Sequence, residues 1–86
     1  MKMKNKILIE LIVPEVDEKY NIYIPINKKI GNIIILLNKS VNELTNGIYD
    51  GTDKSCLYDR VTGEKYSMNS LVRETNIRNG SSLILI

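Results

Sequence analysis

Residues 30–44 read IGNIIILLNKSVNEL, and this stretch decides the fold class because its apolar residues follow a helical period. At about 100° per residue, apolar positions three or four apart gather into one narrow stripe. The stripe consists of Ile30, Ile33, Ile34, Leu37, Val41 and Leu44. Asn27 is the expected N-cap and Asn46-Gly47 the expected C-terminal stop. We therefore predict one amphipathic helix, with Ile35 on its outer side.

The two segments before this helix alternate with a period of two, which is typical of half-buried strands. In residues 7–13 every second residue is apolar, starting from Ile7, and Glu10 lies on the alternate face. In residues 20–26 the apolar face starts at Tyr20 and ends at Ile26. A short polar connection, residues 14–18, joins them. We predict an antiparallel hairpin.

The segments after the helix are shorter. A loop is expected over 48–54, a strand over 55–59 around Leu57, a turn ending at Gly63 and a return strand over 64–68. One helical turn over 71–75, a tight turn at Asn79-Gly80 and a last strand over 83–86 complete the chain. The order is ββαββ, short helix, β. This order predicts an α+β fold, with one helix packed across a mixed sheet, in a single domain over residues 1–86.

Composition narrows the function classes. The 86 residues carry 12 basic and 10 acidic side chains, a net charge of +2, so nothing points to nucleic acid as a partner. There is no histidine, which removes Ser-His and Cys-His nucleophilic pairs. Cys56 is the only cysteine, so neither a disulfide nor a structural zinc site can form within the chain. We expect a cytoplasmic protein with no catalytic residue, no cofactor and no metal.

Two groups of acidic residues are candidates for a cation site or a catalytic site. Residues 50–53, Asp-Gly-Thr-Asp, lack the ligand spacing of a calcium loop and predict a solvated turn. Asp59, Glu64 and Glu74 are interpreted as surface charges rather than paired catalytic carboxylates.

The N-terminal region has some features of a targeting signal. Lys2, Lys4 and Lys6 precede the apolar run 7–13, but Glu10 interrupts that run, which is also too short to span a bilayer. We expect neither a signal peptide nor a transmembrane segment. These lysines, with Lys28 and Lys29, are expected to form a solubilising edge; contact with an acidic partner or a membrane surface is the alternative.

The chain resembles ubiquitin over nearly its whole length, and the resemblance is densest after residue 55. The resemblance rests on Leu57-Tyr58, Gly63, Leu71, Glu74-Thr75-Asn76-Ile77, Leu83 and Leu85, whose spacing is similar. It implies the β-grasp fold, with Asn76-Ile77 buried after the short helix. Within that superfamily the chain is most similar to the YukD/EsaB group of ubiquitin-like proteins associated with type VII (ESX/WXG100) secretion in Gram-positive bacteria. The segments that carry this similarity are 25–34, PINKKIGNII, and 77–85, IRNGSSLIL.

The C-terminal sequence bears on function. Conjugated ubiquitins and related sulfur carriers end in an extended Gly-Gly tail, whereas this sequence ends at Ile86 within the predicted last strand. We therefore expect a protein that is not conjugated. A carrier or modifier whose tail is missing stays open as an alternative.

Alternation also predicts a candidate protein-binding surface. If Leu83 and Leu85 face the helix, then Ile84 and Ile86 point to the opposite face of the sheet, together with Tyr58. Ile35, on the outer side of the helix, is a weaker candidate. These residues predict a non-catalytic adaptor or regulatory subunit that binds protein partners, such as cytosolic parts of a secretion machine. The chain would be a monomer or a weak homodimer, and a self-associating module that uses the same face is the second alternative.

Overall fold

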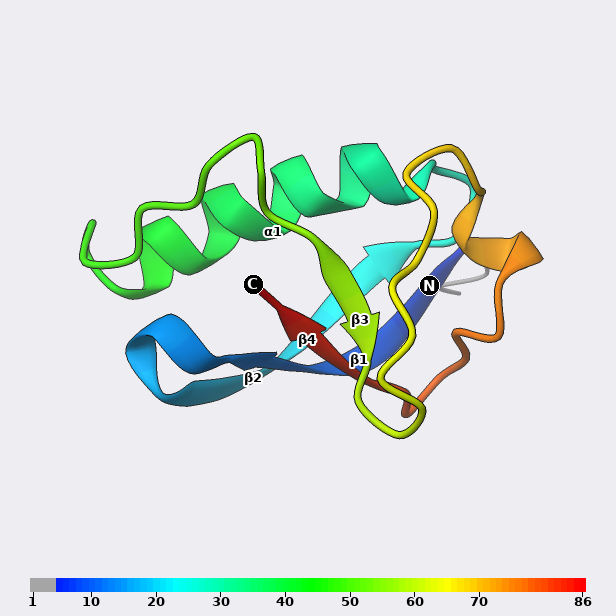
Figure 1. Ribbon diagram of the computed structural model, residues 1–86, viewed down its shortest axis with the longest axis horizontal. Helices are drawn as coiled ribbons and strands as arrows, with labels where there is room; N and C mark the ends of the chain where they lie inside the picture. Colours follow the sequence, from blue (N-terminus) through cyan, green and yellow to red (C-terminus); the bar gives the residue numbers. More distant parts are fainter. Residues whose placement is uncertain (1–4) are drawn as a thin grey trace.

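The computed structural model describes residues 5–86, which form a sheet with one α-helix packed across it (Figure 1). In chain order the elements are β1 (Lys6–Val13), the 3₁₀ turn η1 (Pro14–Val16), β2 (Glu18–Pro25), α1 (Ile30–Leu44), β3 (Leu57–Asp59), the 3₁₀ turn η2 (Val72–Glu74) and β4 (Ser82–Leu85). The predicted α+β architecture is confirmed. Lys2 and Lys4 lie outside the described residues.

The sheet is mixed, with strand order β2-β1-β4-β3. β1 pairs with β2 in an antiparallel hairpin, as predicted, in an unbroken register from Lys6 opposite Pro25 to Val13 opposite Glu18. β4 runs parallel to β1 and antiparallel to β3. The first and last strands of the chain are therefore neighbours at the centre of the sheet, and β2 and β3 form its two edges.

The core lies between the sheet and α1. The apolar stripe of the helix faces the inward residues of the central strands, and Leu83 and Leu85 point inward as predicted. Fully buried side chains come from every layer: Ile9, Leu11, Val13, Ile24, Ile30, Ile33, Leu37, Val41, Leu57, Leu83 and Leu85. Leu44, which the stripe also predicted to be buried, is 57% exposed. It occupies the last turn of α1 and lines a surface groove with Val16 and Tyr20 instead.

The start of α1 differs from the prediction. The residue that precedes the helix is Lys29, not Asn27, and no side chain caps the first turn. Instead the amide of Ile30 donates to the carbonyl oxygen of Ser70 at 2.9 Å, and that of Gly31 donates to Met68 at 3.0 Å. A distant stretch of backbone thus satisfies the free amides of the first turn, a role usually taken by a side chain.

The predicted return strand over 64–68 is also wrong in extent. Only its first half pairs with β3: the amide of Asp59 donates to the carbonyl oxygen of Glu64 at 2.8 Å, and that of Tyr66 donates to Leu57 at 2.9 Å. The chain then leaves the sheet and reaches the start of α1, where Met68 accepts its hydrogen bond. This segment therefore covers the outer edge of β3 and also caps the helix.

Candidate interaction surface

The face of the sheet turned away from α1 carries a row of apolar side chains. Because Ile9, Leu11 and Val13 are buried beneath the helix, the intervening residues of β1 point to the opposite face. In the strand register Ile12 lies opposite Ile84 of β4, and Ile84 lies opposite Tyr58 of β3. Side chains in directly opposed positions are neighbours on the same face. Three adjacent strands therefore contribute one apolar residue each.

Ile86 extends this row at its end. Its amide donates to the carbonyl oxygen of Cys56 at 3.0 Å, and the amide of Cys56 donates back at 2.6 Å, so the β3–β4 ladder continues one pair past Leu57 and Leu85. The side chain of Ile86 is 66% exposed. We name Ile12, Ile84, Tyr58 and Ile86 the apolar row. Three of these four residues were predicted from sequence.

Polar and basic residues surround the apolar row. Lys19 of β2 lies opposite Ile12 at one end, and Lys65 bridges to Tyr58 at the other. The neighbouring set of paired positions is polar: Asn21 and Ser82 flank Glu10, whose carboxylate accepts a hydrogen bond from the Ser82 hydroxyl at 2.9 Å. The row is thus a bounded patch with a lysine at each end.

The helix presents a separate apolar surface. Ile35 is 68% exposed and Leu36 is 46% exposed, both on the side of α1 turned away from the sheet core. Because α1 covers the opposite face of the sheet (Figure 1), Ile35 is not brought together with Tyr58, Ile84 and Ile86. The predicted residues therefore fall on two surfaces.

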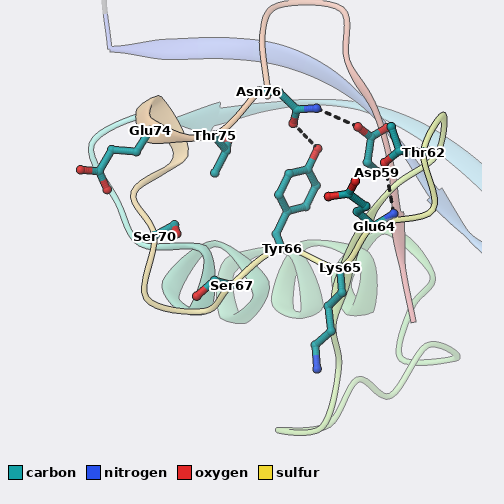
Figure 2. A pocket seen from close by; sticks show the side chains of 10 residues that line it. All are labelled: Asp59, Thr62, Glu64, Lys65, Tyr66, Ser67, Ser70, Glu74, Thr75 and Asn76. Carbon is teal, nitrogen blue, oxygen red and sulfur yellow. Dashed lines mark hydrogen bonds between the residues drawn. The ribbon is translucent and has the colours of Figure 1, made fainter.

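A polar cleft lies beside β3, where the sequence predicted only surface charges (Figure 2). Asp59 is buried, contrary to that prediction. One carboxylate oxygen accepts from the Val61 amide at 2.8 Å, and the other accepts from the side-chain amide of Asn76 at 2.9 Å. The Tyr66 hydroxyl donates to the side-chain oxygen of Asn76 at 2.7 Å. Asn76 itself is exposed, although Ile77 is buried as expected.

These contacts shift two pKa values in opposite directions. The Asn76 amide and the backbone amide of Val61 lower the pKa of Asp59 below its usual range, because both donate to the charged carboxylate. Partial burial, reinforced by the negative charge of Asp59, raises the pKa of Tyr66 to about 12. Each oxygen of Asp59 already accepts a hydrogen bond from the protein. The arrangement therefore ties the segment before β4 to β3, which is a structural role.

The remaining features of residues 5–86 do not point to a metal site or a membrane span. These residues hold no cluster of three or more histidine, cysteine, aspartate or glutamate side chains that could bind a metal ion. Cys56 is half-buried beside the apolar row, and its thiol lies 3.5 Å from the carbonyl oxygen of Lys54. None of the helices described is both long enough and apolar enough to cross a bilayer.

Two apolar residues on these two surfaces were not predicted as candidates: Ile12, which is half-buried in the apolar row, and Leu36, which is exposed beside Ile35. Ile12 could have been found, because it alternates with the inward residues Leu11 and Val13 as Ile84 does with its neighbours. The signal at Leu36 is weaker, because residues 33–37 are all apolar. Only the helical period distinguishes the outward residues of this run from the buried ones.

Comparison with known proteins rests on structure. No protein-family model and no curated protein sequence matches the chain. The EccD5 ubiquitin-like domain from Mycobacterium xenopi is similar in structure, with a TM-score of 0.76 at 17% identity over 94% of this chain and 92% of that one. A chain of the MycP5-free ESX-5 inner membrane complex gives a TM-score of 0.79 at 14% identity, over 95% of this chain. The present chain spans only 21% of that protein.

Eukaryotic domains share the same architecture. The ubiquitin-like domain of an Arabidopsis thaliana protein matches all of this chain with a TM-score of 0.66 at 14% identity, covering 81% of its own length. At such low identity the agreement concerns the backbone alone. Together with the strand order and the single crossing helix, it shows that the chain has the ubiquitin-like β-grasp fold.

Proposed function

We propose that this chain is a non-catalytic adaptor or regulatory subunit that docks on protein partners through the apolar row, in the cytoplasm, as part of a type VII secretion system. The observation that carries the proposal is the row itself. Ile12, Ile84 and Tyr58 run across three adjacent strands on the face that α1 leaves open, and Ile86 adds a largely exposed side chain at their end. Clustered apolar groups on the surface of a small domain mark interaction sites.

The charges around the row suggest which partner surface fits. Lys19 and Lys65 end the row, and Arg60, whose amide donates to the carbonyl oxygen of Ser82, follows β3 on the same edge. A partner that presents aliphatic side chains flanked by carboxylates would bury the row and pair with these cations. Rim charges of this kind mainly raise the association rate and the selectivity.

The assignment to a secretion system rests on similarity. The segments 25–34 and 77–85 resemble the YukD/EsaB proteins, and two structurally similar proteins are described as an EccD5 ubiquitin-like domain and as part of an ESX-5 inner membrane complex. A non-enzymatic role fits the same picture, because the buried carboxylate Asp59 is bonded within the fold and the sequence has no histidine.

The test is a comparison of captured proteins. Wild-type chain and the double variant Tyr58→Asp/Ile86→Asp are immobilised and exposed to lysate from cells that express a type VII system. The matched control is Ile48→Asp/Val61→Asp, which adds the same charges at residues 78% and 82% exposed and outside the apolar row. Far-UV circular dichroism verifies that all three proteins are folded.

Three results are informative. Secretion components bound by wild type and by the control, but lost with the row variant, support both role and surface. Equal binding by all three proteins refutes the surface while the role stands. If no secretion component binds the wild-type chain, the assignment to this system is wrong.

A further inference from the structure

The two edges of the sheet differ: the β3 edge is paired with another segment of the chain, and the β2 edge is open. The outer side of β3 is paired with the segment 64–66 through the amides of Asp59 and Tyr66. Within residues 5–86, β2 has β1 on one side only and is the longer edge, from Glu18 to Pro25. An uncovered edge offers unpaired backbone groups to another strand.

The open backbone groups can be identified from the hydrogen bonds of the hairpin. The amide of Ile26 donates to the carbonyl oxygen of Asn5 at 2.8 Å, so every second residue before it also faces β1. The residues whose N–H and C=O point away from β1 are therefore Lys19, Asn21 and Tyr23. Among residues 5–86, no hydrogen bond reaches these outward groups.

Few features protect this edge against another strand. The register of the hairpin is unbroken, so no bulge twists β2 away. A charged pair, Glu18 and Lys19, begins the strand and Pro25 ends it, which leaves the uncharged residues 20–24 between them. On the core side, Tyr20 and Ile22 remain half-buried.

We propose that β2 is a homodimerisation edge, on which a second copy of this chain adds its own β2 in antiparallel orientation about a two-fold axis at Asn21. The choice of a second copy rests on the fit of the strand to itself. In this register Lys19 lies opposite the partner's Tyr23, and Tyr20 lies opposite the partner's Ile22. No like charges oppose each other, and the half-buried Tyr20 of each copy covers Ile22 of the other. Pro25 of each copy falls outside the paired segment.

Neighbouring registers fit less well. Centring the pair two residues earlier, on Lys19, opposes two lysines, and centring it two residues later, on Tyr23, brings Pro25 into the ladder opposite Asn21, where its missing N–H breaks a bond. If one strand slid by a single residue, an outward amide such as that of Asn21 would lie opposite Ile22, whose amide faces β1, and the hydrogen bonds could not form. Charge, proline position and hydrogen-bond direction thus disfavour these registers, and the cross-linking below distinguishes the register centred on Asn21 from one centred on Tyr20.

The dimer would be isologous, and its consequence for binding is specific. A two-fold axis normal to the sheet keeps the outer faces of both copies on the same side. The continuous eight-stranded sheet would therefore display two apolar rows together, which makes the adaptor bivalent.

Sedimentation velocity over a range of concentrations tests the proposal on the full chain. We expect a concentration-dependent dimer for wild type and for Asn21→Ala, which keeps the amide. Asn21→Pro removes that amide from both copies, and the dissociation constant should rise roughly thirtyfold because two hydrogen bonds are lost. The proline should not unfold the domain, since the Asn21 amide takes no part in the β1–β2 ladder.

Disulfide cross-linking tests the register separately, in a Cys56→Ser background. Asn21→Cys should cross-link efficiently, because residues in a hydrogen-bonded antiparallel pair lie about 5.5 Å apart at Cα. Lys19→Cys alone should not, because its own copy would lie about 13 Å away along the partner strand. A mixture of Lys19→Cys and Tyr23→Cys should cross-link.

Three results would overturn the proposal: a monomer at all concentrations, a dimer unaffected by Asn21→Pro, or a dimer lost with Tyr58→Asp and kept with Asn21→Pro. The last would place self-association on the apolar row instead. None of these outcomes depends on secretion components, so the proposed function can fail or stand independently.

Discussion

Replacement of Ile33 by alanine should lower the free energy of unfolding far more than the same replacement at Ile35. Both residues lie in α1, two positions apart, but Ile33 is fully buried whereas Ile35 is 68% exposed. Ile33→Ala deletes buried methyl and methylene groups and leaves a cavity between helix and sheet, which costs about 2–5 kcal/mol. Because each kcal/mol shifts the midpoint of a domain this small by about 4–8 °C, the thermal midpoint should fall by at least about 8 °C.

Ile35→Ala is the matched control. It changes helix propensity by the same few tenths of a kcal/mol in favour of alanine, and it removes little buried surface. We expect the free energy of unfolding to stay within about 0.5 kcal/mol of wild type. The difference between the two variants therefore isolates burial from every other effect of the substitution.

Urea unfolding followed by far-UV circular dichroism measures both variants. The chain has five tyrosines and no tryptophan, so tyrosine emission serves as the second probe. Unchanged slopes against urea concentration would indicate that the two-state analysis holds. Equal losses for both variants would refute the assignment of the inner and outer sides of α1.

Further predictions concern the polar cleft and one turn. Tyr66 has a pKa of about 12 in the fold, so its contribution to stability is complete below its ordinary pKa of 10.0 and is lost as pH rises through 12. After discounting for solvent screening this amounts to about 1 kcal/mol, and Tyr66→Phe should remove that part of the alkaline decline in urea titrations. Asn76→Ala should raise the pKa of Asp59 toward its usual value, which a carboxyl titration by NMR would detect; an unchanged pKa would contradict the role given to Asn76. Gly63→Ala should cost about 1–2 kcal/mol in urea unfolding, because φ is 77° and no atom lies within 4 Å of the added carbon, so backbone strain alone acts.

The elements that were predictable from sequence are those that local periodicity specifies. The helix over 30–44, the β1–β2 hairpin and the last strand each repeat an apolar position at their own period, and all three are present. The C-terminal stop was equally local: Asn46 and Gly47 both have positive φ, 54° and 86°, which these residue types tolerate best.

The errors lie where a distant segment replaces a local partner. Asn27 is a good N-cap by residue type, but the carbonyl oxygens of Ser70 and Met68 take that role, and the Asn27 side chain accepts from Arg73 at 3.0 Å instead. The same diversion ends the pairing of residues 64–66 early. Asp59 looked like a surface charge because the residues that bury and bond it, Tyr66 and Asn76, follow it in sequence by 7 and 17 positions.

Of the two candidate surfaces, the apolar row could be predicted from sequence and the β2 edge could not. Tyr58 and Ile84 could be predicted to share a face, since each alternates with a buried leucine. The open edge of β2 could not, because whether a strand has one neighbour or two depends on strand order, which places β4 on the far side of β1. Alternation specifies faces, whereas edges are a property of the assembled sheet.

The two proposed surfaces should act independently, and this can be measured. The substituted residues are well separated: Tyr58 on β3 lies three strand spacings, or about 14 Å, from Asn21 on β2, and Ile86, which continues β4, lies at least two spacings, or about 10 Å, away. These separations reach or exceed the distance over which substitutions usually couple. Asn21→Pro should therefore weaken the dimer roughly thirtyfold but leave each copy able to bind a partner, with weaker retention on a surface that carries many partner copies. Tyr58→Asp/Ile86→Asp should abolish partner binding and leave the dimer intact. In the variant that combines all three substitutions, the weakening of the dimer and the loss of partner binding should each be as large as in the separate variants. If Tyr58→Asp/Ile86→Asp also weakened the dimer, or Asn21→Pro also weakened binding of a single partner copy in solution, the apolar row and the β2 edge would share contacts and belong to one interface.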